Sequence, residues 1–208
     1  MKYFKVKVCG ITRPQDGLLA AELGADMIGL IFARRSPRCV SLPQARKIVS
    51  QLPALTQRVG VFVNTPVETM VIRAKQLRLD WVQLHGEESG GVIRSCQKSG
   101  LKVIKAFSVG DGFRWPALQT CPAELVLVDN AGGGSGRAFD WSKSPGRPAP
   151  NLVLAGGISA DNLEEGIGRF EPTVVDVNTS VESKPGVKSP KKLRDFMKKC
   201  HQLRGRCY

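Results

Sequence analysis

Two side chains that can exchange protons stand directly at the ends of apolar, strand-like runs in this sequence. Cys9 closes the run KVKVC, and Asp129 closes the run LVLVD. An ionised thiol can act as a general base, and a carboxylic acid can act as a proton donor. Taken alone, Cys9 is more typical of a small buried apolar position, and Asp129 suits a structural ion pair. Whether they do chemistry depends on what else the fold brings to the same place.

Further polar residues follow two other apolar runs. A loop that carries Arg34, Arg35 and Arg38 comes after the second run, and a fork-shaped guanidinium there could hold a carboxylate. Gln83 and His85 end the run WVQLH, which places them at the rim or in the interior of the fold. Either side chain could bind a ligand or simply hydrogen-bond to the backbone.

The last two apolar runs are followed by residues that suit an anion. Gly156 and Gly157 let the backbone approach a ligand closely. Asn178, Thr179 and Ser180 can open a short extra helix whose exposed N–H groups favour a phosphate. A pair of glycines is weak evidence by itself, but together with the polar trio it predicts a phosphate site if the architecture is a barrel.

The elements that must position these residues alternate regularly along the chain. Runs such as LVLV, with little polar alternation, indicate strands buried on both faces of a parallel sheet. Eight such units without a linker predict one (β/α)8 barrel domain over residues 1–208, with a doubly wound open sheet as the alternative. The site of such a barrel lies at the carboxyl ends of its strands. Strands are predicted at 5–9, 27–32, 58–63, 81–85, 102–107, 125–129, 152–156 and 173–178.

Helices are predicted between these strands, several with Pro or Ser near the first turn. Ser159 is expected to cap the helix after the seventh strand. The segments after the fifth and sixth strands contain Gly and Pro, which disfavour a helix. Glycines 132–134 and 136 make the loop after Asp129 able to close over a ligand. Helices are predicted at 14–24, 42–52, 66–78, 88–100, 159–170 and 189–200.

Composition limits the class of protein. The chain has 208 residues, 42% of them hydrophobic and 24% charged, as expected for a globular protein. None of the six cysteines has the two-residue spacing of a zinc or redox motif, and with only two histidines a metal site is not expected. Neither a signal peptide nor a membrane-spanning segment is recognisable. We therefore expect a cytoplasmic protein with reduced thiols and no membrane partner.

The net charge of +13 raises the question of a nucleic-acid partner. Much of the excess lies at the C-terminal end, where residues 184–208 carry nine Lys or Arg and one acid, Asp195. Leu193, Phe196, Met197 and Cys200 recur at helical spacing there, which predicts a docked last helix with a solvated basic outer face. No aromatic-rich binding motif accompanies the charge, so no specific nucleic-acid partner is expected.

Seven segments follow one another over nearly the whole chain: VKVCGIT, GADMIGLIFARRSPRCVS, VGVFVN, VQLHGEE, GGSGRAFDW, LAGGIS and VDVNTSVESKPGVK. Together and in this order, they resemble the phosphoribosylanthranilate isomerase family. The resemblance implies a (β/α)8 barrel of tryptophan biosynthesis that converts N-(5'-phosphoribosyl)anthranilate into 1-(2-carboxyphenylamino)-1-deoxyribulose 5-phosphate without metal or organic cofactor. By the same resemblance, Cys9 is the general base, Asp129 is the general acid and Arg38 meets the anthranilate carboxylate. Gly157 and residues 178–180 fall on the phosphate site.

The resemblance leaves several expectations open. The family commonly has Ser-Ser-Gly where this chain has Asn178, Thr179 and Ser180, which could loosen the phosphate contact. Cations of the substrate loop, and Lys7 if it points inward, could lower the pKa of the Cys9 thiol. The alternatives are a barrel that also isomerises the histidine-pathway aminoaldose, a nucleic-acid-binding module and a phosphate-binding barrel without activity. We expect a small phosphorylated substrate and a monomer or homodimer.

Overall fold

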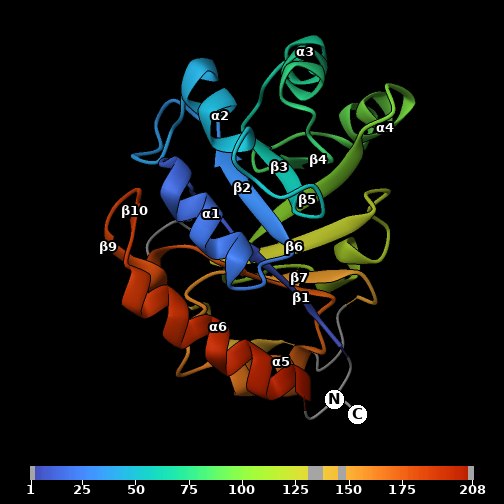
Figure 1. The fold of residues 1–208 in the computed structure, drawn as a ribbon. Helices are drawn as coiled ribbons and strands as arrows, with labels where there is room; N and C mark the ends of the chain where they lie inside the picture. The colour runs from blue at the N-terminus through green and yellow to red at the C-terminus, as the bar shows by residue number, and fades with distance from the viewer. Residues whose placement is uncertain (1–2, 131–137, 145–148, 206–208) are drawn as a thin grey trace.

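The computed structural model describes residues 3–130, 138–144 and 149–205. Within these residues, eight parallel strands form a closed barrel in the order β1 to β8 (Figure 1), and the barrel closes because β8 pairs with β1. The predicted barrel is confirmed, and the alternative of an open sheet is wrong. The strands are β1 (Lys5–Val8), β2 (Met27–Ile31), β3 (Gln57–Phe62), β4 (Trp81–Leu84), β5 (Lys102–Val109), β6 (Leu125–Asn130), β7 (Leu152–Leu154) and β8 (Val174–Val177).

The helices lie outside the strands (Figure 1) and match the six predicted segments. The largest displacement of a start is that of α5, whose N-cap residue is Asn162 rather than Ser159, while α3, α4 and α6 begin one or two residues later than predicted. The Asn162 side chain instead accepts a hydrogen bond from the Ser159 backbone N–H at 2.8 Å, which holds the preceding turn. The helices are α1 (Pro14–Glu22), α2 (Leu42–Val49), α3 (Val67–Leu77), α4 (Gly90–Lys98), α5 (Leu163–Phe170) and α6 (Pro190–Gly205).

The segments rich in Gly and Pro form single 3-10 turns instead of helices. They are η1 (Trp115–Leu118) after β5 and η2 (Trp141–Lys143) after β6, as their composition predicted. A third turn, η3 (Thr179–Val181), follows β8 and is the predicted short extra helix. It leads into a hairpin of β9 (Glu182–Lys184) and β10 (Val187–Lys188).

The alternation of side chains along each strand determines what reaches the cavity. Leu125 and Leu127 of β6 and Val174 of β8 belong to the smaller apolar cluster, to which β2, β3, β5 and β7 also contribute. The alternate residues of the strands, such as Val126 and Val128 of β6, point outward and belong to the larger apolar cluster, which includes the buried faces of the helices. Because inward positions recur every second residue, the next ones along are Asp129 on β6 and Asp176 on β8. The core thus ends in polar groups at the carboxyl ends of the strands.

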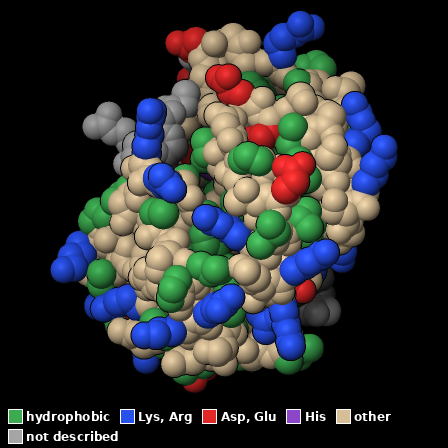
Figure 2. Space-filling model, turned by 90° about the horizontal axis from the view of Figure 1, so that it is seen from above, with side chains coloured by type: hydrophobic (Ala, Val, Ile, Leu, Met, Phe, Trp, Pro, Cys, Tyr) green, Lys and Arg blue, Asp and Glu red, His purple; other side chains and the backbone are tan. Residues whose placement is uncertain are grey.

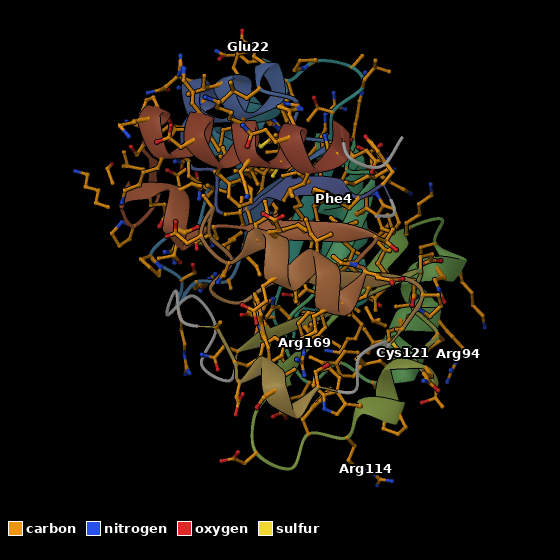
Figure 3. All side chains as sticks on the ribbon, turned by 90° about the horizontal axis from the view of Figure 1, so that it is seen from below. Phe4, Glu22, Arg94, Arg114, Cys121 and Arg169 are labelled. Atoms are coloured by element: carbon orange, nitrogen blue, oxygen red, sulfur yellow. The ribbon has the colours of Figure 1, made fainter. Side chains whose placement is uncertain are left out.

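The last helix, α6, docks through the apolar face that the sequence predicted. Its Leu193, Phe196, Met197 and Cys200 are buried. Seen from below, α6 lies beside α1 (Figure 3), and the two helices are in contact. Near its end, the Nε of Arg204 donates a hydrogen bond of 3.0 Å to the backbone oxygen of Phe4, just before β1. Among the described residues, no helix is both long and apolar enough to cross a membrane.

Candidate active site

A cavity of about 400 Å³ opens at the carboxyl ends of the barrel strands. Apolar side chains such as Ile31 and Val61 line part of its wall, and polar side chains line the rest. Every residue that the sequence predicted for the site borders this cavity. These residues are Cys9, Arg38, Gln83, His85, Asp129, Gly156, Gly157, Asn178, Thr179 and Ser180.

Cys9 follows β1 and is packed tightly into the wall of the cavity. It is 5% exposed, and its backbone N–H donates a hydrogen bond to the oxygen of Val177 on the neighbouring strand β8. Gly29 on β2 lies on its other side, where an added Cβ would stand 2.6 Å from the Cys9 sulfur. The absence of a side chain at Gly29 therefore makes the space that the thiol occupies.

Burial and the neighbouring charges shift the pKa of the Cys9 thiol in different directions. Lys7, two residues earlier on β1, points inward and donates a hydrogen bond of 2.6 Å to Asp176. Burial raises the pKa of Cys9 most, Lys7 and, more weakly, Lys188 lower it, and the charge of Asp176 raises it, so that the net pKa is raised. The predicted inward Lys7 acts in the expected direction, but the net pKa of the resting thiol is raised rather than lowered. The thiol form therefore dominates in the resting site.

Asp129 ends a chain of polar contacts across the cavity. Its Oδ1 accepts a hydrogen bond of 2.7 Å from the backbone N–H of Asn130, and its Oδ2 lies 3.5 Å from His85 Nε2. His85 Nδ1 in turn lies 3.0 Å from Gln83 Nε2. Gly156 approaches from β7 so closely that an added Cβ would stand 2.8 Å from Asp129 Oδ1. The predicted closing loop, with glycines 132–134 and 136, lies outside the described residues.

Arg38 is the only arginine of its loop that is buried. Its guanidinium binds Glu182 through both carboxylate oxygens, with Nη2 to Oε2 at 2.7 Å and Nε to Oε1 at 2.9 Å. The side chains are 6% and 3% exposed, respectively. Arg34 and Arg35 are exposed, although Arg35 also borders the cavity. The structure thus holds one planar cation rigidly at the cavity wall.

The predicted phosphate-binding segments meet on one side of the cavity. Gly156 and Gly157 both have positive φ angles, 76° and 69°, a conformation that glycine adopts without strain. The Ser180 hydroxyl donates a hydrogen bond of 2.5 Å to the backbone oxygen of Ile158 and ties η3 to the loop after β7. Asn178 accepts a hydrogen bond of 2.8 Å from Lys188 Nζ. Backbone groups of two consecutive loops are therefore fixed beside each other.

Three charged residues at the site were not singled out from the sequence. Asp176 borders the cavity, while Glu182 and Lys188 form a buried ion pair at 3.2 Å behind Arg38 and Asn178. The alternation of inward positions along β8 could have indicated Asp176. Two buried acceptors at the cavity, Gln83 Oε1 and Asp176 Oδ1, have no hydrogen-bond partner among the described residues. Buried acceptors without partners suit a ligand that brings hydroxyl groups.

The same residues offer little to a metal ion. No group of three or more His, Cys, Asp or Glu side chains with ligand geometry occurs in the part of the chain that the structure describes. The cysteines found there, including Cys9, are free thiols. What the arrangement can do is exchange protons through Cys9 and Asp129, fix a carboxylate at Arg38 and surround an anion with backbone groups.

Comparison with known proteins identifies the family of this chain. Residues 6–199 match the family model described as N-(5'phosphoribosyl)anthranilate (PRA) isomerase. The N-(5'-phosphoribosyl)anthranilate isomerase of Rubrobacter xylanophilus is 42% identical over 93% of this chain and 97% of its own. The crystal structure of phosphoribosyl anthranilate isomerase from Thermotoga maritima is 36% identical with a TM-score of 0.89, covering 97% of this chain and 100% of its own.

A second solved structure is informative about ligands. It is a phosphoribosyl anthranilate isomerase in complex with reduced 1-(o-carboxyphenylamino)-1-deoxyribulose 5-phosphate. It is 35% identical to this chain with a TM-score of 0.85, and the match covers 97% of this chain and 100% of that one. A phosphorylated, carboxylated sugar derivative therefore binds to a protein with this fold.

Proposed function

The chain belongs to the N-(5'-phosphoribosyl)anthranilate isomerase family, and from that premise we propose which of its residues carry out the reaction. The protein is an isomerase that converts N-(5'-phosphoribosyl)anthranilate into 1-(2-carboxyphenylamino)-1-deoxyribulose 5-phosphate in tryptophan biosynthesis. In the proposal, Asp129 is the general acid, Cys9 is the general base, and the remaining predicted residues bind substrate.

The reaction is an Amadori rearrangement, which moves hydrogen within one molecule. A proton delivered to the ribose ring oxygen breaks the C1'–O bond and leaves an iminium at C1'. Loss of the C2' proton then sends its bonding electrons into the iminium, and the resulting enolamine becomes the ketose by proton transfer to C1'. The protein must supply one proton donor and one proton acceptor, each contributing about 10²- to 10⁴-fold when positioned.

One observation carries this assignment: the proton donor and the proton acceptor come from different strands but border the same cavity. Cys9 follows β1, Asp129 is the last residue but one of β6, and both border the cavity at the carboxyl ends of the barrel strands. The contact of Asp129 with His85 supports a fixed orientation for the acid. Lys7 and Lys188 support the thiolate that the base role of Cys9 requires.

The substrate groups fit the remaining lining. The buried guanidinium of Arg38 suits the anthranilate carboxylate, and backbone N–H groups at Gly157 and residues 178–180 suit the phosphate. Gln83 and Asp176 present the acceptors that sugar hydroxyls would complete. In this arrangement the anthranilate and phosphate ends of the substrate bind to different loops, with the reacting carbons between Cys9 and Asp129.

The proposal extends to the domain organisation, the oligomeric state and the partners of the protein. We propose that residues 1–208 form one domain that works as a monomer or homodimer in the cytoplasm. Lys and Arg side chains are scattered over the face seen in Figure 2 rather than gathered in one patch. On α6, Lys191 pairs with Asp195 at 2.9 Å and Lys199 with Glu164 at 2.6 Å. This distribution supports a solvated basic surface without a specific nucleic-acid partner.

The test of the base assignment is Cys9→Ser, which nearly preserves size and polarity. A serine hydroxyl is too weak an acid to supply the anion, so kcat should fall by about 10²-fold or more. The decrease in phosphoribosylanthranilate fluorescence measures turnover, and the melting temperature checks folding. A folded Cys9→Ser protein with parental kcat, purified from a host that lacks its own isomerase, would overturn the assignment.

A further inference from the structure

Lys7 is buried between two groups that both attract its ammonium group. It is 0% exposed, and its Nζ lies 2.6 Å from Asp176 Oδ2. The register of the barrel makes this contact direct, because Lys7 of β1 is paired with Asp176 of β8. Cys9 follows two positions later on the same inward face, and its side chain interacts electrostatically with Lys7. One cation therefore serves two acceptors.

The ion pair of Lys7 and Asp176 leaves part of the hydrogen-bonding capacity of Asp176 unused. Burying two charges is costly unless their remaining hydrogen-bonding capacity is also satisfied. Asp176 Oδ1 has no partner among the described residues, although Asp176 is buried and borders the cavity. A purely structural pair would satisfy that oxygen, so the placement of Asp176 at the cavity indicates a role connected with the cavity.

We propose that Lys7 is a positioning residue that holds the thiolate of Cys9 when it forms, while Asp176 draws the same ammonium group away from the sulfur. The proposal rests on the assignment of Cys9 as the general base. Lys7 then acts through Cys9 and does not itself touch the substrate. Asp176 sets how much of the lysine's charge is available to the sulfur.

The other charged groups near Lys7 and Asp176 support these two roles, in which Lys7 holds the thiolate and Asp176 competes for the ammonium group. Lys188 from β10 and Arg38 from the loop after β2 also interact with Cys9. Both of them bind Glu182, at 3.2 and 2.7 Å. The three cations therefore face two carboxylates, Glu182 and Asp176, and a thiolate at Cys9 would balance the remaining positive charge.

Asp176 has charged neighbours of its own. Asp129 at the end of β6 and His85 after β4 interact with it electrostatically across the cavity, with opposite signs. Neither of them contacts Lys7 through a hydrogen bond that the structure records, whereas Asp176 does at 2.6 Å. Asp176 is therefore the group that competes with Cys9 for Lys7.

This competition predicts opposite effects for two isosteric changes. Lys7→Met removes the charge and keeps the length of the side chain, so the thiolate should form less readily. Asp176→Asn removes the competitor, so the thiolate should form more readily. A merely structural pair would give no such opposition, because breaking it from either side would loosen the same contact.

The experiment is the rate of Cys9 alkylation by iodoacetamide between pH 7 and pH 10, followed by mass spectrometry of the Cys9 peptide. Because only the thiolate reacts, the rate at a fixed pH reports the thiolate fraction. At pH 8 we expect about a tenfold lower rate in Lys7→Met, which corresponds to one pKa unit, and a higher rate in Asp176→Asn. Unchanged rates, or changes of the same sign in both variants, overturn the proposal. If Lys7→Met fails to fold, an unchanged or lower rate in Asp176→Asn overturns it alone.

A matched control comes from a second buried ion pair at β5, a strand that pairs with neither β1 nor β8. Lys105 is also buried, and its Nζ lies 2.9 Å from Glu88. Lys105→Met should leave the Cys9 alkylation rate within twofold of the parent, and a tenfold loss there would attribute the effect to general loosening and overturn the proposal. Activity of Cys9→Ser separates this inference from the proposed function. Parental activity of Cys9→Ser with opposed alkylation rates refutes the base role, and with it the catalytic purpose of Lys7, but not the competition for its charge. Lost activity of Cys9→Ser with unchanged alkylation rates refutes only the role of Lys7.

Discussion

Cys9 and Gly29 are packed so closely that a Cβ added at Gly29 would stand 2.6 Å from the Cys9 sulfur and 3.1 Å from its Cα. Both the thiol and the backbone that carries it would have to move. Gly29→Ala should therefore lower kcat by about tenfold or more, because an ångström of misplacement is costly for a catalytic group. Steady-state kinetics and thermal unfolding of the variant measure the two effects separately.

The matched control for this change is Gly168→Ala on α5. An added Cβ at Gly168 meets no heavy atom within 4 Å. Replacing an exposed glycine within a helix by alanine should stabilise the protein by about 0.5 to 1 kcal/mol and leave kcat unchanged. Parental kcat in folded Gly29→Ala would show that the thiol tolerates displacement, which is incompatible with the base role.

The acid assignment is tested by Asp129→Asn, which keeps the shape of the side chain but removes the transferable proton. We expect kcat to fall by about 10²-fold or more, with a smaller change in KM. The double variant with Cys9→Ser should lose less than the product of the two single losses, because both groups act on one bound substrate. Losses that multiply fully would indicate two independent functions.

The residues that line this site could be predicted because each is indicated by a short stretch of sequence around it. The apolar run before Asp129 indicates a buried strand, and a strand of a parallel barrel delivers its last inward residue to the cavity. The partners of these residues could not be predicted, because they depend on how the barrel closes. Glu182 meets Arg38 across 144 residues of sequence. The β9–β10 hairpin, which was not predicted, brings Lys188 behind Asn178.

The predicted carboxylate contact of Arg38 can be separated from its structural pairing with Glu182. Reduced 1-(o-carboxyphenylamino)-1-deoxyribulose 5-phosphate and its analogue without the carboxylate provide the comparison. The parent should bind the carboxylated compound more tightly, by about 10- to 100-fold, since a charge-assisted hydrogen bond is worth about 1.5 to 3 kcal/mol. In Arg38→Lys this ratio should shrink, because one compact ammonium group cannot bind both Glu182 and the substrate carboxylate as the guanidinium can.

Inhibition constants for the two compounds give that ratio independently of any loss of stability. Arg38→Lys keeps a positive charge beside Glu182, so the buried carboxylate retains a partner. An unchanged ratio in a folded Arg38→Lys protein would show that the anthranilate carboxylate binds elsewhere.

The phosphate site is tested at Gly157, whose φ is +69°. Gly157→Ala adds backbone strain and places a methyl group where the phosphate is expected to approach. Inorganic phosphate should inhibit the parent competitively, and Gly157→Ala should raise both KM and the inhibition constant for phosphate. Gly100→Ala is the control, because Gly100 has a φ of +80° and open space around it. Equal effects of the two variants on KM would attribute the change to strain alone.

The buried carboxylate of Glu88 predicts how stability depends on pH. Burial tends to raise the pKa of Glu88, but Lys105 and the backbone N–H donors, including that of Asn64, outweigh burial and lower it. A carboxylate with a lowered pKa in the folded state stabilises the protein above the pKa of the unfolded chain, about 4.3 for Glu. This stabilisation is lost as the pH falls through the folded-state pKa, where Glu88 becomes protonated.

Glu88→Gln should therefore be less stable than the parent at pH 7, by about 1.5 to 3 kcal/mol, since hydrogen bonds to a charged group are lost. The difference should shrink as the pH falls below about 4, because protonation makes the parent resemble the variant. Urea unfolding between pH 3 and pH 7 measures the free energy of unfolding for both proteins. The exposed neighbour provides the control, and Glu87→Gln should match the parent throughout. A constant difference between Glu88→Gln and the parent across this range would mean that the charge of Glu88 does not stabilise the fold, and that its turn is held by packing alone.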